Sequence, residues 1–185
     1  LYVGDMSKRK IYLTFDLGYE AGYTAEVLDI LKEYQISALF FLCGNYLQQK
    51  ELINRMQNEG HQLGNHTNKH RDLPTLNDEE IRKDIVDLKL PVSAKFFRPP
   101  QGRFDAKTLC IAKEEGLRAV LWGLAIEDWQ KSPKLNVEKC TKKILDRVHP
   151  GAIMLFHITN PGTPEMLREV IPALQAKGYS FGELN

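Results

Sequence analysis

The sequence has little cysteine and no excess of charge of either sign. Its three cysteines, Cys43, Cys110 and Cys140, are an odd number and lie at spacings that no metal finger uses. At least one of them must be free within the chain, so a disulfide framework is not expected. The 25 lysines and arginines nearly balance the 24 aspartates and glutamates, which leaves a formal net charge of +1. This balance offers no electrostatic footprint for nucleic acid or for an anionic membrane.

Long apolar runs and phosphate-binding loops are also missing. No uninterrupted apolar run reaches the roughly 18 residues that span a bilayer, and Leu1–Asp5 lacks the basic-then-apolar order of a signal peptide. Because the chain begins with Leu1 rather than Met, we expect that an upstream segment has been removed. There is no G-x-G-x-x-G loop and no internal repeat. The length of 185 residues predicts a single domain over residues 1–185, with one substantial core.

Short apolar runs alternate with amphipathic segments along the whole chain. The apolar runs predict buried strands at residues 11–18, 36–43, 61–65, 94–97, 117–123, 152–156 and 179–181, with a mixed segment at 124–129. The segments between them predict helices over 24–34, 47–59, 77–88, 105–115 and 137–148, and one that ends at Gly178. Thr24 is the predicted N-cap of the first helix, and Asn77 with Glu80 forms a predicted capping box. This alternation indicates a parallel α/β protein.

Five chemically capable side chains fall at or just beyond the C-terminal ends of strand candidates: Asp16, His66, Arg98, Asp128 and His157. Five strands that feed one rim are typical of a barrel, whereas a doubly wound sheet gathers its site around one switch point. The chain is shorter than the roughly 200 residues or more of an eight-unit barrel. We therefore predict a shortened, irregular (β/α) barrel, TIM-like, with about seven parallel strands.

Four side chains suggest hydrolytic chemistry, each with a plainer alternative. His66 and His70 are four residues apart, which puts both imidazoles on one side of a helical turn and can offer two nitrogens to a divalent metal. The alternative is a solvated surface turn. Asp16 can act as a general base on a metal-bound water, or it can merely cap the turn that follows its strand. His157 can protonate a leaving amine or alkoxide, or it can be a satisfied core histidine.

The remaining candidates orient these groups or contact a substrate. Arg98 precedes two prolines, so its backbone is extended and its guanidinium is aimed rather than mobile. Pairing with Asp16 would keep that carboxylate ionised. Asp128 can fix the tautomer of His157 and raise its basicity. Trp129 offers a stackable wall for a sugar ring, or it packs in the core.

In chain order, the sequence carries five motifs: T-F-D-x-G at 14–18, H-T-N-K-H at 66–70, R-P-P-x-G at 98–102, D-W at 128–129 and L-F-H at 155–157. The set resembles the ordered motifs of the polysaccharide deacetylase (NodB-homology) family, and the resemblance covers residues 10–181. The string from Thr14 to Thr24, together with H-P-G-A at 149–152, is most similar to the delta-lactam branch, the peptidoglycan N-acetylmuramic acid deacetylases of spore-forming bacteria.

The resemblance implies roles for individual residues. Asp16 is implied as the catalytic base, His157 as the catalytic acid, Arg98 as the tether of the base and Asp128 as the partner that tunes the acid. The implied ligands of a divalent metal, zinc first among the candidates, are His66 and His70. The backbone N–H of Gln101 is implied to bind the tetrahedral oxyanion, and Leu155 and Trp129 to line the pocket for the acetyl methyl. The implied reaction hydrolyses an N-acetyl group of a cell-wall glycan and releases acetate.

The sequence departs from the family pattern at Leu17, where most members have a second aspartate that completes an Asp-His-His metal site. Two histidines and water hold a divalent ion more weakly, because one anionic ligand is missing. The segment between Leu88 and Lys95 is also shorter than usual, which trims one wall of the groove. Two alternatives stay open: a deacetylase of chitin oligosaccharides or other N-acetylglucosamine polymers, and a non-catalytic glycan-binding module. The implied location is extracellular or at the cell wall, and we favour a monomer.

Overall fold

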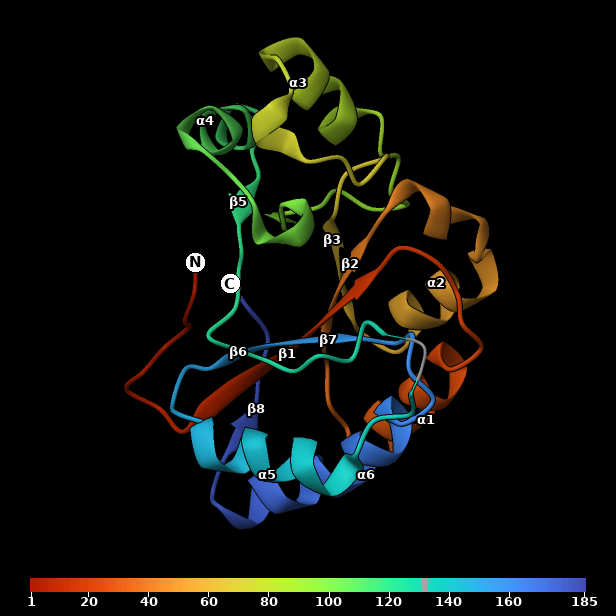
Figure 1. Ribbon diagram of the computed structural model, residues 1–185, viewed down its shortest axis with the longest axis vertical. Coiled ribbons are helices and arrows are strands. Elements are labelled where there is room, and N and C mark those ends of the chain that lie inside the picture. Colours follow the sequence, from red (N-terminus) through yellow and green to blue (C-terminus); the bar gives the residue numbers. More distant parts are fainter. Residues whose placement is uncertain (131–132) are drawn as a thin grey trace.

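The centre of the protein is a sheet of short strands that are all paired in parallel (Figure 1). The computed structural model describes residues 1–130 and 133–185, and counts of elements refer to these residues. The strands are β1 (Lys10–Leu17), β2 (Leu39–Leu42), β3 (Gln62–Asn65), β4 (Phe96–Phe97), β5 (Arg118–Ala119), β6 (Leu124–Ala125), β7 (Ile153–His157) and β8 (Ser180–Phe181). They lie in the order β5-β4-β3-β2-β1-β7-β6, and β8 pairs with β1.

The sheet is curled so that its two edges approach each other. The edge strands β5 and β6 are consecutive in the sequence, and only residues 120–123 connect them. They nevertheless lie at opposite ends of the strand order. A connection of four residues spans at most about 14 Å, so the outer strands are brought close together without pairing. The prediction of an irregular (β/α) barrel with about seven parallel strands is confirmed.

Helices cover the outer face of the sheet in two groups (Figure 1). The helices are α1 (Thr24–Glu33), α2 (Lys50–Asn58), α3 (Asp78–Val86), α4 (Ala106–Glu114), α5 (Val137–Arg147) and α6 (Thr163–Ala176), with 3-10 turns at Gly44–Gln48, Leu73–Thr75 and Pro100–Gly102. The helices α1, α2, α5 and α6 pack with β1, β2 and β7 in the main core, whereas α3 and α4 pack over β4 in a separate cluster. No helix within the described part of the chain has the length and apolar character needed to cross a membrane.

The alternation of side chains along β1 separates two apolar layers. The odd-numbered residues from Ile11 to Leu17 belong to the helix-facing core, while Tyr12 belongs to a cluster inside the barrel with Phe41 and Ile153. Because successive side chains of a strand point to opposite faces, Asp16 faces the barrel interior. Leu17 is 1% exposed and packs on the opposite face, among the helices.

The structure corrects several predictions about individual elements. Thr24 does not cap α1, because the N-cap position is Tyr23 and has no side-chain cap. The carboxylate of Glu20 instead accepts hydrogen bonds from the backbone N–H groups of Gly22 and Thr24 and from the Thr24 hydroxyl. The strand predicted at 117–123 is only Arg118–Ala119.

The shortening of that strand has a physical reason in the site. The backbone carbonyls of Val120 and Leu121 accept hydrogen bonds from the Arg98 side chain, at 3.0 and 2.9 Å. The residue after Arg98 is Pro99, which has no N–H to continue the pairing with β4. The mixed segment predicted at 124–129 begins with β6. The helix predicted at 47–59 begins only at Lys50, after a 3-10 turn. The capping box of Asn77 and Glu80 is confirmed, with both of its hydrogen bonds formed.

Candidate active site

Parallel register gathers the strand-end side chains at one rim of the barrel. Asp16 on β1 is the register partner of His157 on β7. On the other side, Asn65 at the end of β3 pairs with Phe97 of β4, so the residues that follow, His66 and Arg98, leave adjacent strands at the same level. The structure therefore brings together the groups that the sequence predicted for one rim.

Arg98 holds one oxygen of the Asp16 carboxylate. Its Nη1 lies 2.8 Å from Asp16 Oδ1, its side chain is fully buried, and its guanidinium lies over the ring of Phe41 at 4.2 Å. Burial by itself raises the pKa of Asp16, but the positive charge of Arg98 and the nearby His66 and His157 outweigh it, so this pKa lies below its usual range. Asp16 is therefore an ionised carboxylate with Oδ2 left for other partners.

His66 presents a single nitrogen to Asp16. Its Nδ1 lies 2.8 Å from the Arg98 carbonyl oxygen, which can only accept a hydrogen bond, so we assign the proton to Nδ1. The other nitrogen, Nε2, then carries the lone pair and lies 3.6 Å from Asp16 Oδ2. Burial lowers the pKa of His66 to about 4. The ring is thus neutral near pH 7 and able to act as a ligand.

His70 reaches the site from a loop rather than from the predicted helical turn. Thr67 and His70 both have left-handed backbone conformations, with φ of 64° and 53°, and residues 66–70 form no helix. The Thr67 hydroxyl accepts a hydrogen bond of 3.0 Å from the His70 N–H and closes the loop. The two imidazoles meet edge to face with centroids 4.9 Å apart. The spacing thus brings both rings together, but through a left-handed turn.

The imidazoles of His66 and His70 are nitrogen donors of the kind that divalent metals bind. A hydrogen bond from the ring nitrogen that does not bind the metal to a backbone carbonyl, as His66 Nδ1 makes to Arg98, orients metal-binding histidines. The side chain of Leu17 packs among the helices and supplies no donor. In the part of the chain that the structure describes, no cluster of three or more histidine, cysteine, aspartate or glutamate side chains is arranged to hold a metal ion.

Across the rim, Asp128 holds His157 by two hydrogen bonds. Its Oδ1 lies 2.9 Å from His157 Nδ1, and its Oδ2 accepts the His157 backbone N–H at 2.7 Å. Burial lowers the pKa of His157, but the hydrogen bond and the negative charge of Asp128 outweigh this effect and raise the pKa above its usual value. Because Nδ1 is occupied, Nε2 is the nitrogen that can deliver a proton.

The three predicted substrate contacts lie at different depths. Trp129 is half exposed, with its ring centroid 6.0 Å from that of His157, so it is not a core residue. Leu155 is buried and lies two residues before His157 in β7, so both side chains are on the same face of the strand. Gln101 is exposed and left-handed, with φ of 58°, inside the tight turn that follows Arg98. Their predicted roles remain predictions.

Two supporting residues escaped the sequence interpretation. The buried side chain of Asn160 accepts hydrogen bonds from the N–H groups of Leu135 and Gly162, and it donates to the carbonyl oxygens of Gln130 and Pro133. Asp84, the other residue, is buried beneath the His70 loop. Neither residue belongs to one of the five motifs, so the sequence carries no signal that sets them apart from other polar residues.

Comparison with known proteins points to one family. Residues 3–120 match the family described as polysaccharide deacetylase. The chain is 34% identical over 192 residues to the peptidoglycan-N-acetylmuramic acid deacetylase PdaA of Bacillus subtilis, which covers 100% of this chain and 73% of that protein. The solved structure of PdaA, described as a family 4 carbohydrate esterase, matches with a TM-score of 0.92 over 98% of this chain and 81% of that chain.

Two further relatives show the range within this similarity. A peptidoglycan-N-acetylglucosamine deacetylase of Bacillus cereus is 31% identical over 191 residues, which cover 97% of this chain and 68% of that protein. A CE4 family pseudoenzyme from Bacillus anthracis matches with a TM-score of 0.89 at 27% identity, over 98% of this chain and 66% of that chain. The same fold thus carries enzymes with different sugar preferences and at least one protein described as a pseudoenzyme.

Proposed function

The chain belongs to the polysaccharide deacetylase family, and from this premise we propose that it removes N-acetyl groups from the N-acetylmuramic acid of peptidoglycan. The family activity is that of a hydrolase acting on carbon–nitrogen bonds. The observation that carries the proposal is the pairing of Asp16 with His157 across two adjacent strands, each held by its own buried partner. A base and an acid on one rim are what amide hydrolysis requires.

In the proposed reaction, the two groups move one proton each. Asp16 Oδ2 takes a proton from the attacking water while Arg98 keeps Oδ1 in place. The water oxygen bonds to the acetyl carbon, and the resulting oxyanion is stabilised by the backbone N–H of Gln101. His157 then delivers a proton from Nε2 to the sugar nitrogen, and the carbon–nitrogen bond breaks. The products are acetate and a sugar with a free amine. Asp128 balances the charge of the protonated ring.

We also propose that His66 and His70 hold a divalent metal, zinc first among the candidates. When bound, such an ion would polarise the acetyl carbonyl and would lower the pKa of a water molecule attached to it. The neutral state of His66 near pH 7 supports this ligand role. Metal analysis of the purified protein, with activity measured before and after chelation, tests it. Undiminished activity at near-zero occupancy would remove the two histidines from the ligand role.

The muramic acid preference is supported by the similarity to PdaA and by the branch-specific strings. A preference for N-acetylglucosamine is the second candidate, supported by the Bacillus cereus relative. Product mass and position on defined oligosaccharides separate the two. Because the proposed substrate is a cell-wall polymer, we propose that the protein acts outside the cell or in the wall. We also propose that it acts as a monomer.

Acetate release from peptide-stripped peptidoglycan tests the proposed activity. We expect release by the wild type and a loss of about 10²–10⁴-fold in Asp16→Asn, because general base catalysis contributes about that much. Asp146→Asn is the matched control, since its carboxylate pairs with Lys142 on the exposed surface of α5. Equal release by wild type and Asp16→Asn would refute the role of Asp16. Saturable glycan binding without acetate formation would favour the binding module, which the likeness to a pseudoenzyme supports.

A further inference from the structure

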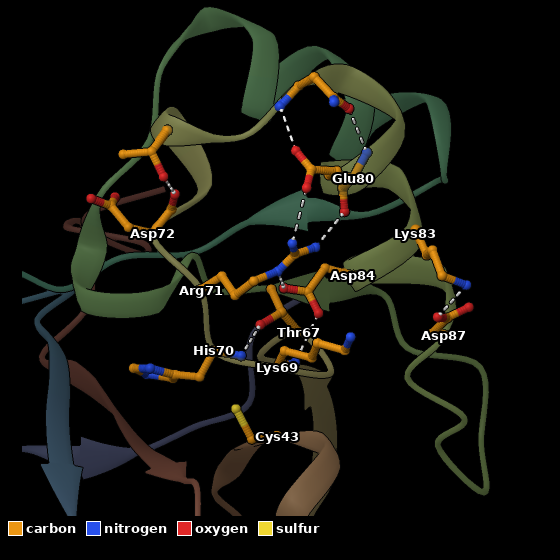
Figure 2. A network of polar contacts seen from close by, with 12 residues as sticks. Cys43, Thr67, Lys69, His70, Arg71, Asp72, Glu80, Lys83, Asp84 and Asp87 are labelled. Atoms are coloured by element: carbon orange, nitrogen blue, oxygen red, sulfur yellow. Dashed lines mark hydrogen bonds and ion pairs between the residues drawn. The ribbon is translucent and has the colours of Figure 1, made fainter.

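Several contacts fasten the loop that carries His70 to α3, and the buried carboxylate of Asp84 makes two of them. Its side chain is completely buried. Oδ1 accepts a hydrogen bond of 2.8 Å from the Lys69 N–H, and Oδ2 lies 3.3 Å from Arg71 Nε. The backbone carbonyl of Asp84 also accepts the Asn68 N–H at 2.8 Å. These contacts hold the chain immediately before and immediately after His70, as Figure 2 shows for the side-chain contacts.

The His70 loop needs an external anchor because its backbone is strained. A left-handed residue other than glycine is strained and persists only where its surroundings over-determine it. Thr67 and His70 are both in this region. The hydrogen bond from the His70 N–H to the Thr67 hydroxyl lies within the loop, so it cannot fix the loop relative to the barrel. The contacts with Asp84 can.

The helix that carries Asp84, α3, is held by its own N-terminal cap and by packing against the sheet. Its capping box is complete, and Glu80 of that box also pairs with Arg71, through a carboxylate contact of 3.4 Å and a backbone carbonyl contact of 3.1 Å. Its apolar face, Ile81 and Ile85, packs in the cluster that contains Phe97 of β4. Asp84 thus connects the loop to a helix that is packed on the sheet next to Arg98.

We propose that Asp84 is a positioning residue for His70. A carboxylate suits this task because it offers two acceptor oxygens and a negative charge, which serve the Lys69 N–H and the Arg71 guanidinium together. The side chain of Asp84 does not enter the site. Its effect on turnover passes through the position of the His70 ring, and only that kinetic part rests on the proposed function.

The test compares Asp84→Ala and Asp84→Asn with Asp87→Asn. Asp87 follows the same helix, but its carboxylate pairs with Lys83 on the surface at 2.8 Å, so it is the matched control. The first readout is the imidazole nitrogen NMR spectrum, with the His70 signals assigned from His70→Gln. In Asp84→Ala we expect the His70 signals to shift or broaden while those of His157, on the opposite wall, stay in place. Asp84→Asn retains one acceptor oxygen and gives a smaller change.

The second readout is the kinetics of acetate release. A misplacement of about 1 Å costs up to about 10²-fold in rate, so we expect kcat of Asp84→Ala to fall between about tenfold and 10²-fold with little change in KM. Asp84→Asn should lie between Asp84→Ala and the wild type. Asp87→Asn should match the wild type in both readouts.

Several results would overturn the proposal. Unchanged His70 signals in Asp84→Ala would do so. Equal shifts at His70, at His157 and at His61, whose ring packs against Phe40 of β2, would do so as well, because they would indicate general destabilisation. If Asp84→Ala does not fold, Arg71→Met serves as the second variant. It removes the partner of Asp84 Oδ2, and Arg71 itself is only partly buried. The proposal then requires that Arg71→Met shift the NMR signals of His70 and leave those of His157 in place. The spectra do not depend on activity, so an inactive wild type would refute the proposed function and still decide the role of Asp84.

Discussion

Strand ends hold one half of the site, and loops hold the other half. Asp16 and His157 end adjacent strands in direct register, and Arg98 follows β4 with a fully buried side chain. His70 and Trp129 instead lie on loops and are exposed. Register fixes the first group because the sheet hydrogen bonds set the height of each residue on the rim. The second group depends on polar anchors elsewhere in the fold.

This difference predicts how each half fails. A strand-end side chain is buried with its partner, so removing it leaves a charge unsatisfied and affects folding as well as chemistry. A loop side chain can be removed with little effect on folding, whereas removal of its anchor moves it. Substitutions in the two halves should therefore separate into effects on the free energy of unfolding and effects on kinetics.

The largest effect is expected for Arg98→Met, which keeps most of the side-chain volume but removes the guanidinium. The Asp16 carboxylate would lose its ion pair, and the carbonyls of Val120 and Leu121 would lose their donors. Breaking a buried ion pair by removing one partner costs about 3–5 kcal/mol. We expect that loss in the free energy of unfolding, measured by urea denaturation.

Arg103→Met is the control for this substitution. Arg103 pairs with Asp72 at 2.7 Å, but its side chain is 57% exposed, and such surface pairs contribute at most about 1 kcal/mol. If both variants lost the same free energy of unfolding, the distinction between buried strand-end pairs and exposed pairs would be wrong.

The next effect is expected for Asp128→Asn. The amide would no longer raise the pKa of His157, so that pKa should fall. Because the proposed acid acts only when it is protonated, the alkaline limb of the pH profile of kcat/KM should move to lower pH. The acid limb, set by the low pKa of Asp16, should stay in place. We expect a loss of about 10²-fold near pH 8, measured by acetate release across pH.

The same substitution has a defined effect on stability. A raised pKa in the folded state adds stability that is fully present below the unfolded pKa, about 6.5 for histidine, and is lost as pH rises through the folded pKa. Asp128→Asn should remove this contribution at low pH. Glu127→Gln, at the neighbouring exposed residue, should leave both profiles unchanged. An unmoved alkaline limb in Asp128→Asn would exclude His157 as the titrating acid.

A smaller effect is expected for Asn160→Ala, which tests the anchor near the Trp129 wall. The buried amide contacts four backbone groups, including the carbonyl of Gln130 next to Trp129. Leaving buried polar groups without partners costs about 1–3 kcal/mol, so we expect a loss of that size in urea denaturation. KM should rise as well, because Trp129 loses its neighbouring anchor.

Asn160→Asp separates the two halves of that anchor. Aspartate keeps the oxygen that accepts the N–H groups of Leu135 and Gly162 but cannot donate to the carbonyls of Gln130 and Pro133. A rise in KM in Asn160→Asp as large as in Asn160→Ala would place the effect in the donor contacts. Unchanged KM in both variants would contradict an anchoring role.

The same division explains what the sequence could predict. The sequence could predict the strand-end half of the site because apolar runs lead into Asp16, Arg98 and His157. The strand period of two residues also assigns Leu17 to the opposite face from Asp16. For His70, the spacing predicts proximity to His66, but nothing in Thr67 or His70 signals a positive φ. Of the anchoring residues, Asp84 lies 15 residues from its partner Lys69, and Asn160 lies 25 residues from its partner Leu135. Contacts across such distances depend on tertiary packing, which local patterns do not encode.

The smallest effect is expected for Trp129→Ala. The ring is half exposed and has its nearest ring contact with His157, at 6.0 Å. An aromatic contact of this kind contributes about 0.5–1.5 kcal/mol, so KM for an oligosaccharide should rise between about twofold and tenfold while kcat and the urea midpoint stay close to wild type. Trp129→Phe retains a stacking face and should recover most of the loss. A fall in kcat with unchanged KM would instead mean that Trp129 orients His157, and the loop half of the site would then include part of the catalytic geometry.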